Sequence, residues 1–131
     1  MNSVKIEWAI PQPPEEGLKL PGVQKEWLHA IQKWAAGEEF IDAIYAFGSR
    51  VRGDYFLVSD LDLAILLSGK PYPDPERPYW RFNHERVERE IQALIEAPLD
   101  LNVLHLTDWD DTTKFVRDEG VTIYVNPNPY Q

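Results

Sequence analysis

A short run of residues near the middle of the chain has the types and spacing needed to bind phosphate. The apolar segment Ile41–Phe47 runs directly into Gly48 and Ser49, and Arg50 and Arg52 follow at once. A strand that ends in Gly-Ser and turns into a helix leaves backbone N–H groups available for phosphate oxygens. Glycine suits this position because a Cβ on residue 48 would occupy the space of the phosphate. We therefore predict that this turn, the Ser49 hydroxyl and both arginines bind a triphosphate.

Three aspartates downstream have the spacing of metal ligands. Asp60 and Asp62 are two residues apart in a segment with the pattern of a strand. Their carboxylates should therefore leave the same face, with Cα atoms roughly 7 Å apart. Mg²⁺ prefers oxygen ligands and is commonly held by one or two carboxylates together with substrate phosphates. Asp100 stands between apolar residues on another predicted strand, and if the two strands are neighbours, the three carboxylates converge, as two-metal phosphoryl transfer requires. Asp100 could also accept the proton of an attacking hydroxyl.

The elements that must position these residues alternate between strands and helices. Strands are predicted at Ile41–Phe47, Asp60–Leu67, Leu99–His105 and Val121–Val125, the second and third from apolar residues with a period of two. Helical spacing predicts helices over Gly22–Ala36 with Gly37 as C-cap, from the end of the Ser68–Pro78 loop to about Ala97, and from Thr107 to about Glu119. This order indicates an α/β fold.

Proline-rich segments divide the chain. We expect a folded domain over residues 22–125, preceded by a strand and connector at 1–21 and followed by a tail at 126–131. The strand is predicted at Val4–Ile10, before the first prolines. The Ser68–Pro78 loop is interpreted as a stiff connector. The alternative is that an aromatic residue in or just after it lines the mouth of the site: Tyr72, Tyr79 or Trp80.

Several polar residues favour structural interpretations. The aspartates after Thr107 suit the N-terminus of a helix and its dipole better than a metal: Asp108, Asp110 and Asp111. The three histidines lack metal-ligand spacing. Arg50 and Arg52 have a structural alternative of their own, as surface residues paired with Asp54.

Composition narrows the function classes. The chain has 131 residues, of which 44% are hydrophobic, enough for one core. It has no cysteine, which excludes disulfides and thiolate metal sites, and no apolar run long enough to span a bilayer. We therefore expect a soluble, cytoplasmic protein. The net charge of −9 argues against binding a long nucleic acid, because phosphate backbones are held by clustered Lys and Arg.

The motif resembles that of a known superfamily. Gly48-Ser49, ten residues, and then Asp60-x-Asp62 is similar to the signature of the DNA polymerase β-like nucleotidyltransferases. The fuller pattern, with Arg50-x-Arg52-Gly53 and Ser59 before the aspartates, resembles the minimal nucleotidyltransferase (MNT) branch over about Ile41 to Tyr124. The resemblance implies a small mixed sheet with helices packed on one face. It also implies that Gly48 and Ser49 hold the nucleotide phosphates and that Asp60, Asp62 and Asp100 hold magnesium.

The resemblance also implies an activity. It points to Mg²⁺-dependent transfer of AMP from ATP to a hydroxyl. Within the MNT branch, it implies an antitoxin that adenylylates a helical HEPN-type toxin, the other half of a toxin–antitoxin pair. Two alternatives stay open: a nucleotide-binding or steric partner subunit with little turnover, and a small-molecule nucleotidyltransferase of the aminoglycoside type, although such enzymes generally carry an extra helical domain.

Overall fold

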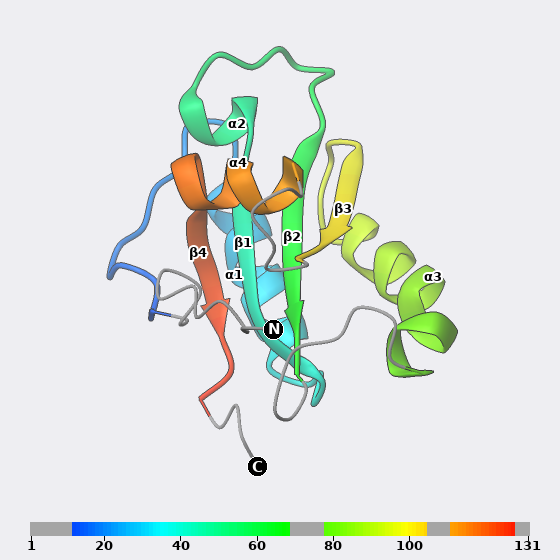
Figure 1. Ribbon diagram of the computed structural model, residues 1–131. Coiled ribbons are helices and arrows are strands. Elements are labelled where there is room, and N and C mark those ends of the chain that lie inside the picture. Colours follow the sequence, from blue (N-terminus) through cyan, green and yellow to red (C-terminus); the bar gives the residue numbers. More distant parts are fainter. Residues whose placement is uncertain (1–11, 69–77, 105–110, 128–131) are drawn as a thin grey trace.

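Four strands form one mixed sheet in the order β3-β2-β1-β4 (Figure 1). The computed structural model describes residues 12–68, 78–104 and 111–127. The strands are β1 (Ile41–Phe47), β2 (Leu61–Leu67), β3 (Leu99–Val103) and β4 (Val121–Val125). β1 is antiparallel to both of its neighbours, whereas β2 and β3 are parallel. A parallel pair needs a crossover connection, and here the helix α3 (Pro78–Gln92) supplies it.

Helices cover both faces of the sheet. Helix α1 (Lys25–Ala35) lies behind the sheet in Figure 1, α3 stands at the right and shares the core of α1, and α4 (Asp111–Glu119) crosses in front of the sheet. The expectation of helices on one face therefore holds for α1 and α3 but not for α4. The short helix α2 (Ser49–Arg52) follows β1 directly. The longest of these, α3, has 15 residues, and within the described ranges no helix is long and apolar enough to cross a membrane.

The alternation of side chains along the strands explains the two layers. Alternate residues of β2 are almost fully buried in the larger core with α1 and α3: Leu61, Leu63, Ile65 and Leu67. Alternate residues of β1 point the other way, into a smaller core with Val116 of α4: Ala43, Tyr45 and Phe47. Because both faces are covered, every residue of β1 is buried.

The register of the parallel pair places two predicted site residues opposite each other. Asp62 of β2 is the direct partner of Asp100 of β3, one step after the partners Leu61 and Leu99. The predicted adjacency of these strands is therefore confirmed. The shared face of the two carboxylates follows from local pattern, since the apolar residues on either side of each aspartate face the core.

Element boundaries differ from the predictions mainly at helix ends. β1 and β4 have the predicted limits, and β2 begins one residue late, at Leu61. Helix α1 is shorter than predicted because Gln24 is extended, and its C-cap is Ala36 rather than Gly37. Helix α3 ends at Gln92 instead of near Ala97. There the Gln92 side chain donates to the Ala97 carbonyl and accepts from the Leu99 N–H, which holds the chain in a turn towards β3.

Some predictions lie outside the described residues. These are the strand at Val4–Ile10, most of the proline loop with Tyr72, the end of the third predicted strand at His105, and the cap at Thr107. The described part of the connector includes Leu18 and Leu20, which pack against the larger core.

Candidate active site

A cleft of about 450 Å³ lies where β1, β2 and β3 meet α2 and α4. Most of the predicted site residues line it, and residues of α4 form the opposite wall. The lining comprises Phe47, Gly48, Ser49, Arg52, Asp62, Asp100, Asn102, Asp111, Thr112 and Phe115. The sequence interpretation did not include Asn102, Thr112 and Phe115, and it gave Asp111 only a capping role at the start of α4.

Asp62 and Asp100 form a carboxyl pair across the parallel strands. The pKa of Asp62 is raised to about 7, first because burial disfavours its charged form. A hydrogen bond with Asp100 and the negative charges of Asp100 and Asp60 act in the same direction, while the positive charge of Arg52 opposes them. Two carboxyl groups this close disfavour double ionisation unless a cation lies between them.

The chemistry of this pair fits a hard divalent cation. Carboxylate oxygens are the ligands that Mg²⁺ prefers, and one or two carboxylates are a common set when phosphates complete the shell. The full three-aspartate cluster is not formed, however. Asp60 is exposed, precedes β2 and acts on Asp62 through its charge. Over the described residues, no three His, Cys, Asp or Glu side chains form a group that could hold a metal ion.

The Gly48 turn is shaped by its neighbour Asp62. Gly48 has φ of 84°, in the region that favours glycine. A Cβ at this position would overlap Asp62 Oδ2 and lie 2.9 Å from its Cγ. The sequence argument reserved that space for a phosphate, and the structure shows that the carboxylate of Asp62 takes it. Glycine at 48 therefore lets the turn and the carboxyl pair approach each other.

Glu119 is a site residue that sequence reasoning missed. Its Oε1 accepts a hydrogen bond from the Gly48 N–H at 3.1 Å and another from Arg52 Nη1 at 2.8 Å. Glu119 is the last residue of α4, where the helix dipole disfavours a carboxylate. The two donors compensate for that position. The only signal in the sequence is that an acid stands in the last turn of a predicted helix, just before Gly120, where its charge and the negative end of the helix dipole repel each other.

The two predicted phosphate-binding arginines have different surroundings. Arg52 lines the cleft and pairs with Asp54 and Glu119. Arg50 is 5% exposed and donates to the backbone carbonyls of Gly22 and Ser59 at 2.8 and 2.9 Å. The prediction that Arg50 binds phosphate does not fit this placement, because its guanidinium is engaged inside the protein.

The aromatic residues proposed for the mouth of the site lie elsewhere. Tyr79 and Trp80 are on α3 and pack against the larger core. The Tyr79 hydroxyl donates to Glu38, and its ring is tilted against Phe40 with centroids 4.8 Å apart. Neither residue lines the cleft within the described part of the chain. Their role here is to fix α3 on the sheet.

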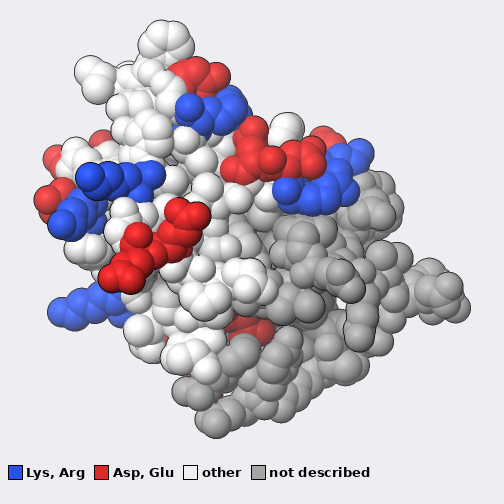
Figure 2. Space-filling model, turned by 90° about the vertical axis from the view of Figure 1, so that its left-hand side faces the viewer, with Lys and Arg blue, Asp and Glu red and all other residues white. Residues whose placement is uncertain are grey.

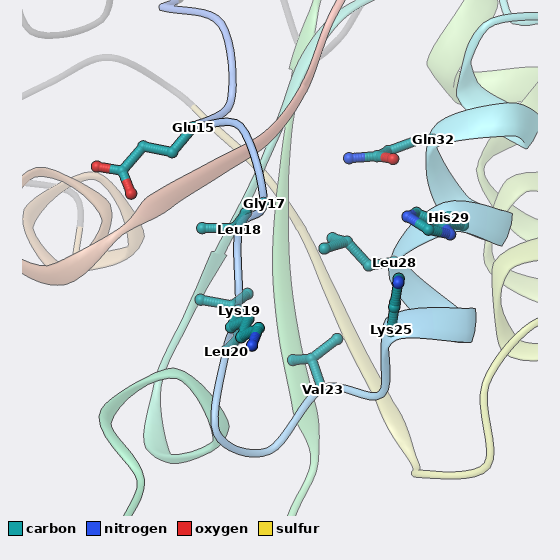
Figure 3. Close-up of a pocket in the computed structure, with 10 residues that line it drawn as sticks. All are labelled: Glu15, Gly17, Leu18, Lys19, Leu20, Val23, Lys25, Leu28, His29 and Gln32. Atoms are coloured by element: carbon teal, nitrogen blue, oxygen red, sulfur yellow. The ribbon is translucent and has the colours of Figure 1, made fainter.

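A second cavity of about 450 Å³ lies between the connector and α1 (Figure 3). Its floor is apolar, with Leu18, Leu20, Val23 and Leu28, and Lys19, Lys25 and His29 are at its border. Among the described residues that line it, Glu15 is the one carboxylate, and these residues include no acid pair like that of the cleft. We assign the chemistry to the cleft for that reason.

The fold and the cleft together define a nucleotidyltransferase domain, and comparison of the sequence with known families agrees. The family described as polymerase beta nucleotidyltransferase matches residues 29–128, which include the turn and all three aspartates. The chain therefore belongs to the polymerase β-like nucleotidyltransferases and has their fold. No protein with a curated description matches the chain in sequence.

Solved structures that are similar to the protein include the crystal structure of a candidate nucleotidyltransferase from Sulfolobus solfataricus, 21% identical, with a TM-score of 0.47. The match covers 82% of this chain and 84% of that one. A likeness at this level carries no argument about activity, so the family assignment depends on the sequence match.

Proposed function

We propose that the protein transfers AMP from ATP to a hydroxyl group of a partner protein, in a Mg²⁺-dependent reaction. The observation that carries the proposal is the Asp62–Asp100 pair beside the Gly48–Ser49 turn, in a chain of the nucleotidyltransferase family. An acid pair and a phosphate-binding turn in one cleft are the two parts that nucleotidyl transfer needs.

Each residue has a defined task in this proposal. The turn at Gly48 and Ser49, with Arg52, binds and orients the triphosphate. Asp62 and Asp100 would hold magnesium, which neutralises phosphate charge when bound, and Asp60 would add negative charge beside them. Asp100 accepts the proton of the acceptor hydroxyl. The acceptor oxygen then bonds to the α-phosphorus, the bond to the β-phosphate oxygen breaks, and pyrophosphate leaves.

The surroundings of the cleft favour a protein acceptor over a nucleic acid. The net charge of −9 repels a polyanion, and Arg52, the cation that lines the cleft in the described residues, is already paired with two acids. A folded acceptor that docks on the protein holds its hydroxyl in a fixed position, which lowers the entropic cost of placing that hydroxyl in the cleft. The family resemblance of the motif suggests a helical HEPN-type protein as that acceptor, in a toxin–antitoxin pair.

Incubation with labelled ATP, Mg²⁺ and the product of a neighbouring gene for a small helical protein tests this function. We expect AMP on a hydroxyl of that protein, identified by mass spectrometry, and none with Asp62→Asn. Exposed Asp118, which pairs with Arg117 and does not line the cleft, offers the matched Asp118→Asn control, which should transfer normally. Rapid modification of a small molecule without any partner would contradict the proposal.

Binding can be measured separately from transfer. ATP should raise the unfolding temperature only when Mg²⁺ is present, because triphosphate and carboxylate charges repel without a cation. At a hundredfold excess over Kd, the stabilisation is about 2.7 kcal/mol. Equal shifts with and without Mg²⁺ would contradict a shared cation.

A further inference from the structure

The connection between α2 and β2 exposes three consecutive large apolar side chains. Phe56, Leu57 and Val58 are 76, 90 and 82% exposed. The connection is the uppermost segment of Figure 1, and Figure 2 shows an uncharged projection at the same end, with charged groups at its base. Single exposed apolar residues are ordinary, whereas a contiguous apolar patch commonly marks an interaction site.

A buried cation holds the backbone beneath this patch. Arg50 donates to the carbonyls of Leu57 and Ser59 at 3.0 and 2.9 Å, and to Gly22 at 2.8 Å. The Phe56 N–H donates to Ser59 Oγ at 2.8 Å. Burying a guanidinium is costly unless it is fully hydrogen-bonded, and here its partners are backbone carbonyls of the loop itself and of Gly22. The three apolar side chains are therefore presented to solvent from a fixed backbone.

The patch is adjacent to the catalytic carboxylates in the chain. Val58 lies two residues before Asp60, and β2 continues from there to Asp62. A molecule that docks on the patch is therefore held close to the cleft. Residues 54–60 contain two acids, Asp54 and Asp60, and no base, and both acids are exposed. The surface that fits this segment is apolar at its centre and basic at its border.

We propose that Phe56, Leu57 and Val58 form the docking patch for the acceptor protein, whose matching surface is an apolar depression bordered by Lys or Arg. The inference rests on the proposed function and names the surface that selects the acceptor. A nucleic acid would be repelled by Asp60 and by the net charge of −9, because Arg52 already pairs with Asp54, and a second copy of this chain would bring two sets of the same acids together. The fixed backbone reduces the ordering cost of association.

The test compares exposed apolar residues at two places. Phe56→Ser removes a ring of the patch, and Phe82→Ser removes a ring that is equally exposed, at 81%, but lies on α3. A triple variant, with Ser at 56, 57 and 58, removes the whole patch. Each is incubated with [α-³²P]ATP, Mg²⁺ and an extract of the source organism, with acceptor limiting. Unfolding temperature and Mg-ATP affinity, measured on each variant, exclude misfolding.

We expect the triple variant to label the acceptor at least tenfold more slowly, Phe56→Ser to be slowed severalfold, and Phe82→Ser to match the unaltered protein. With purified acceptor, the defect should appear in KM rather than kcat. Equal labelling by the triple variant would overturn the docking patch and leave the proposed function standing. Absence of any labelled protein with the unaltered chain would refute the proposed function, and the patch assignment with it. A homodimer that the triple variant dissociates would assign the patch to a second copy instead.

Discussion

The two sides of α2 show how one short sequence serves both fold and site. Arg50 and Arg52 are two residues apart in a helix of four residues. At 3.6 residues per turn, such positions point roughly 200° apart, so they cannot share an environment. Arg50 faces inward, between the rings of Trp27 and Tyr55 and the backbone of the next loop. Arg52 faces the cleft and two carboxylates.

The difference teaches that a basic residue beside a phosphate-binding turn need not bind phosphate. The buried side of α2 fixes the connector through Gly22, whose N–H donates to the Arg50 carbonyl at 2.7 Å. A Cβ on Gly22 would lie 2.6 Å from the Arg50 Cβ, so this contact requires glycine. The open side is left free to respond to a ligand, since its contacts are between exposed ionic groups.

The largest effect should come from the carboxyl pair on the open side. Asp62→Asn should lower the rate of transfer by at least about 10³-fold, equivalent to about 4 kcal/mol, because it removes a negative charge that would hold magnesium beside the phosphates. Single-turnover kinetics with labelled ATP would measure it. The same change should not destabilise the metal-free protein, since it relieves repulsion between Asp62 and Asp100. If Asp62→Asn instead lowered the free energy of unfolding of the metal-free protein, Asp62 would have a structural role rather than a catalytic one.

A smaller but still large effect is expected on the buried side. Arg50→Met should lower the free energy of unfolding by about 3 kcal/mol, because several backbone carbonyls lose a charged donor inside the protein. Urea unfolding followed by circular dichroism would measure this. Loss of ATP affinity in Arg50→Met without loss of stability would return Arg50 to the phosphate-binding residues.

Arg52→Met is the matched comparison for Arg50→Met. Arg52→Met should change the free energy of unfolding by less than about 1 kcal/mol, since its ion pairs are exposed. It should weaken Mg-ATP binding about tenfold, or about 1.4 kcal/mol, because it removes the positive charge at the cleft. Isothermal titration gives the affinity. If Arg50→Met and Arg52→Met changed both the free energy of unfolding and the Mg-ATP affinity by the same amounts, the two sides of α2 would not have different roles.

The sequence predicts the frame of this site better than its details. The strands were predictable because apolar alternation fixes which face each side chain takes, and the same alternation placed Asp62 and Asp100 on one face. The Gly48 turn was predictable because few residues tolerate its backbone. The role of Arg50 was not predictable. One of its carbonyl partners is Gly22, 28 residues away in sequence, and its other partners lie in a loop whose path no periodic pattern indicates.

Glu119 shows the same limit from the other direction. Its contact with Gly48 joins residues 71 apart in sequence, and it depends on α4 crossing the second face of the sheet. The resemblance implied helices on one face, which left no reason to bring the end of α4 to the turn. The α3 boundary was missed for a local reason, since a side chain, Gln92, replaces backbone partners as the helix ends.

The smallest expected effect is at Glu119, and it should have the opposite sign to that of Arg52. The Glu119 carboxylate occupies two donors, the Gly48 N–H and Arg52 Nη1, that the proposed triphosphate would use. Glu119→Gln keeps the size and an acceptor oxygen but removes the negative charge that competes with phosphate. Mg-ATP binding should therefore tighten about threefold, or about 0.7 kcal/mol, within the range of exposed ion pairs. Glu119 competes with phosphate for the Arg52 guanidinium. The gain in Mg-ATP affinity should therefore shrink when Glu119→Gln is combined with Arg52→Met. A double-mutant cycle of Kd values would measure that coupling. Weaker ATP binding by Glu119→Gln would instead mean that Glu119 positions Arg52 for phosphate.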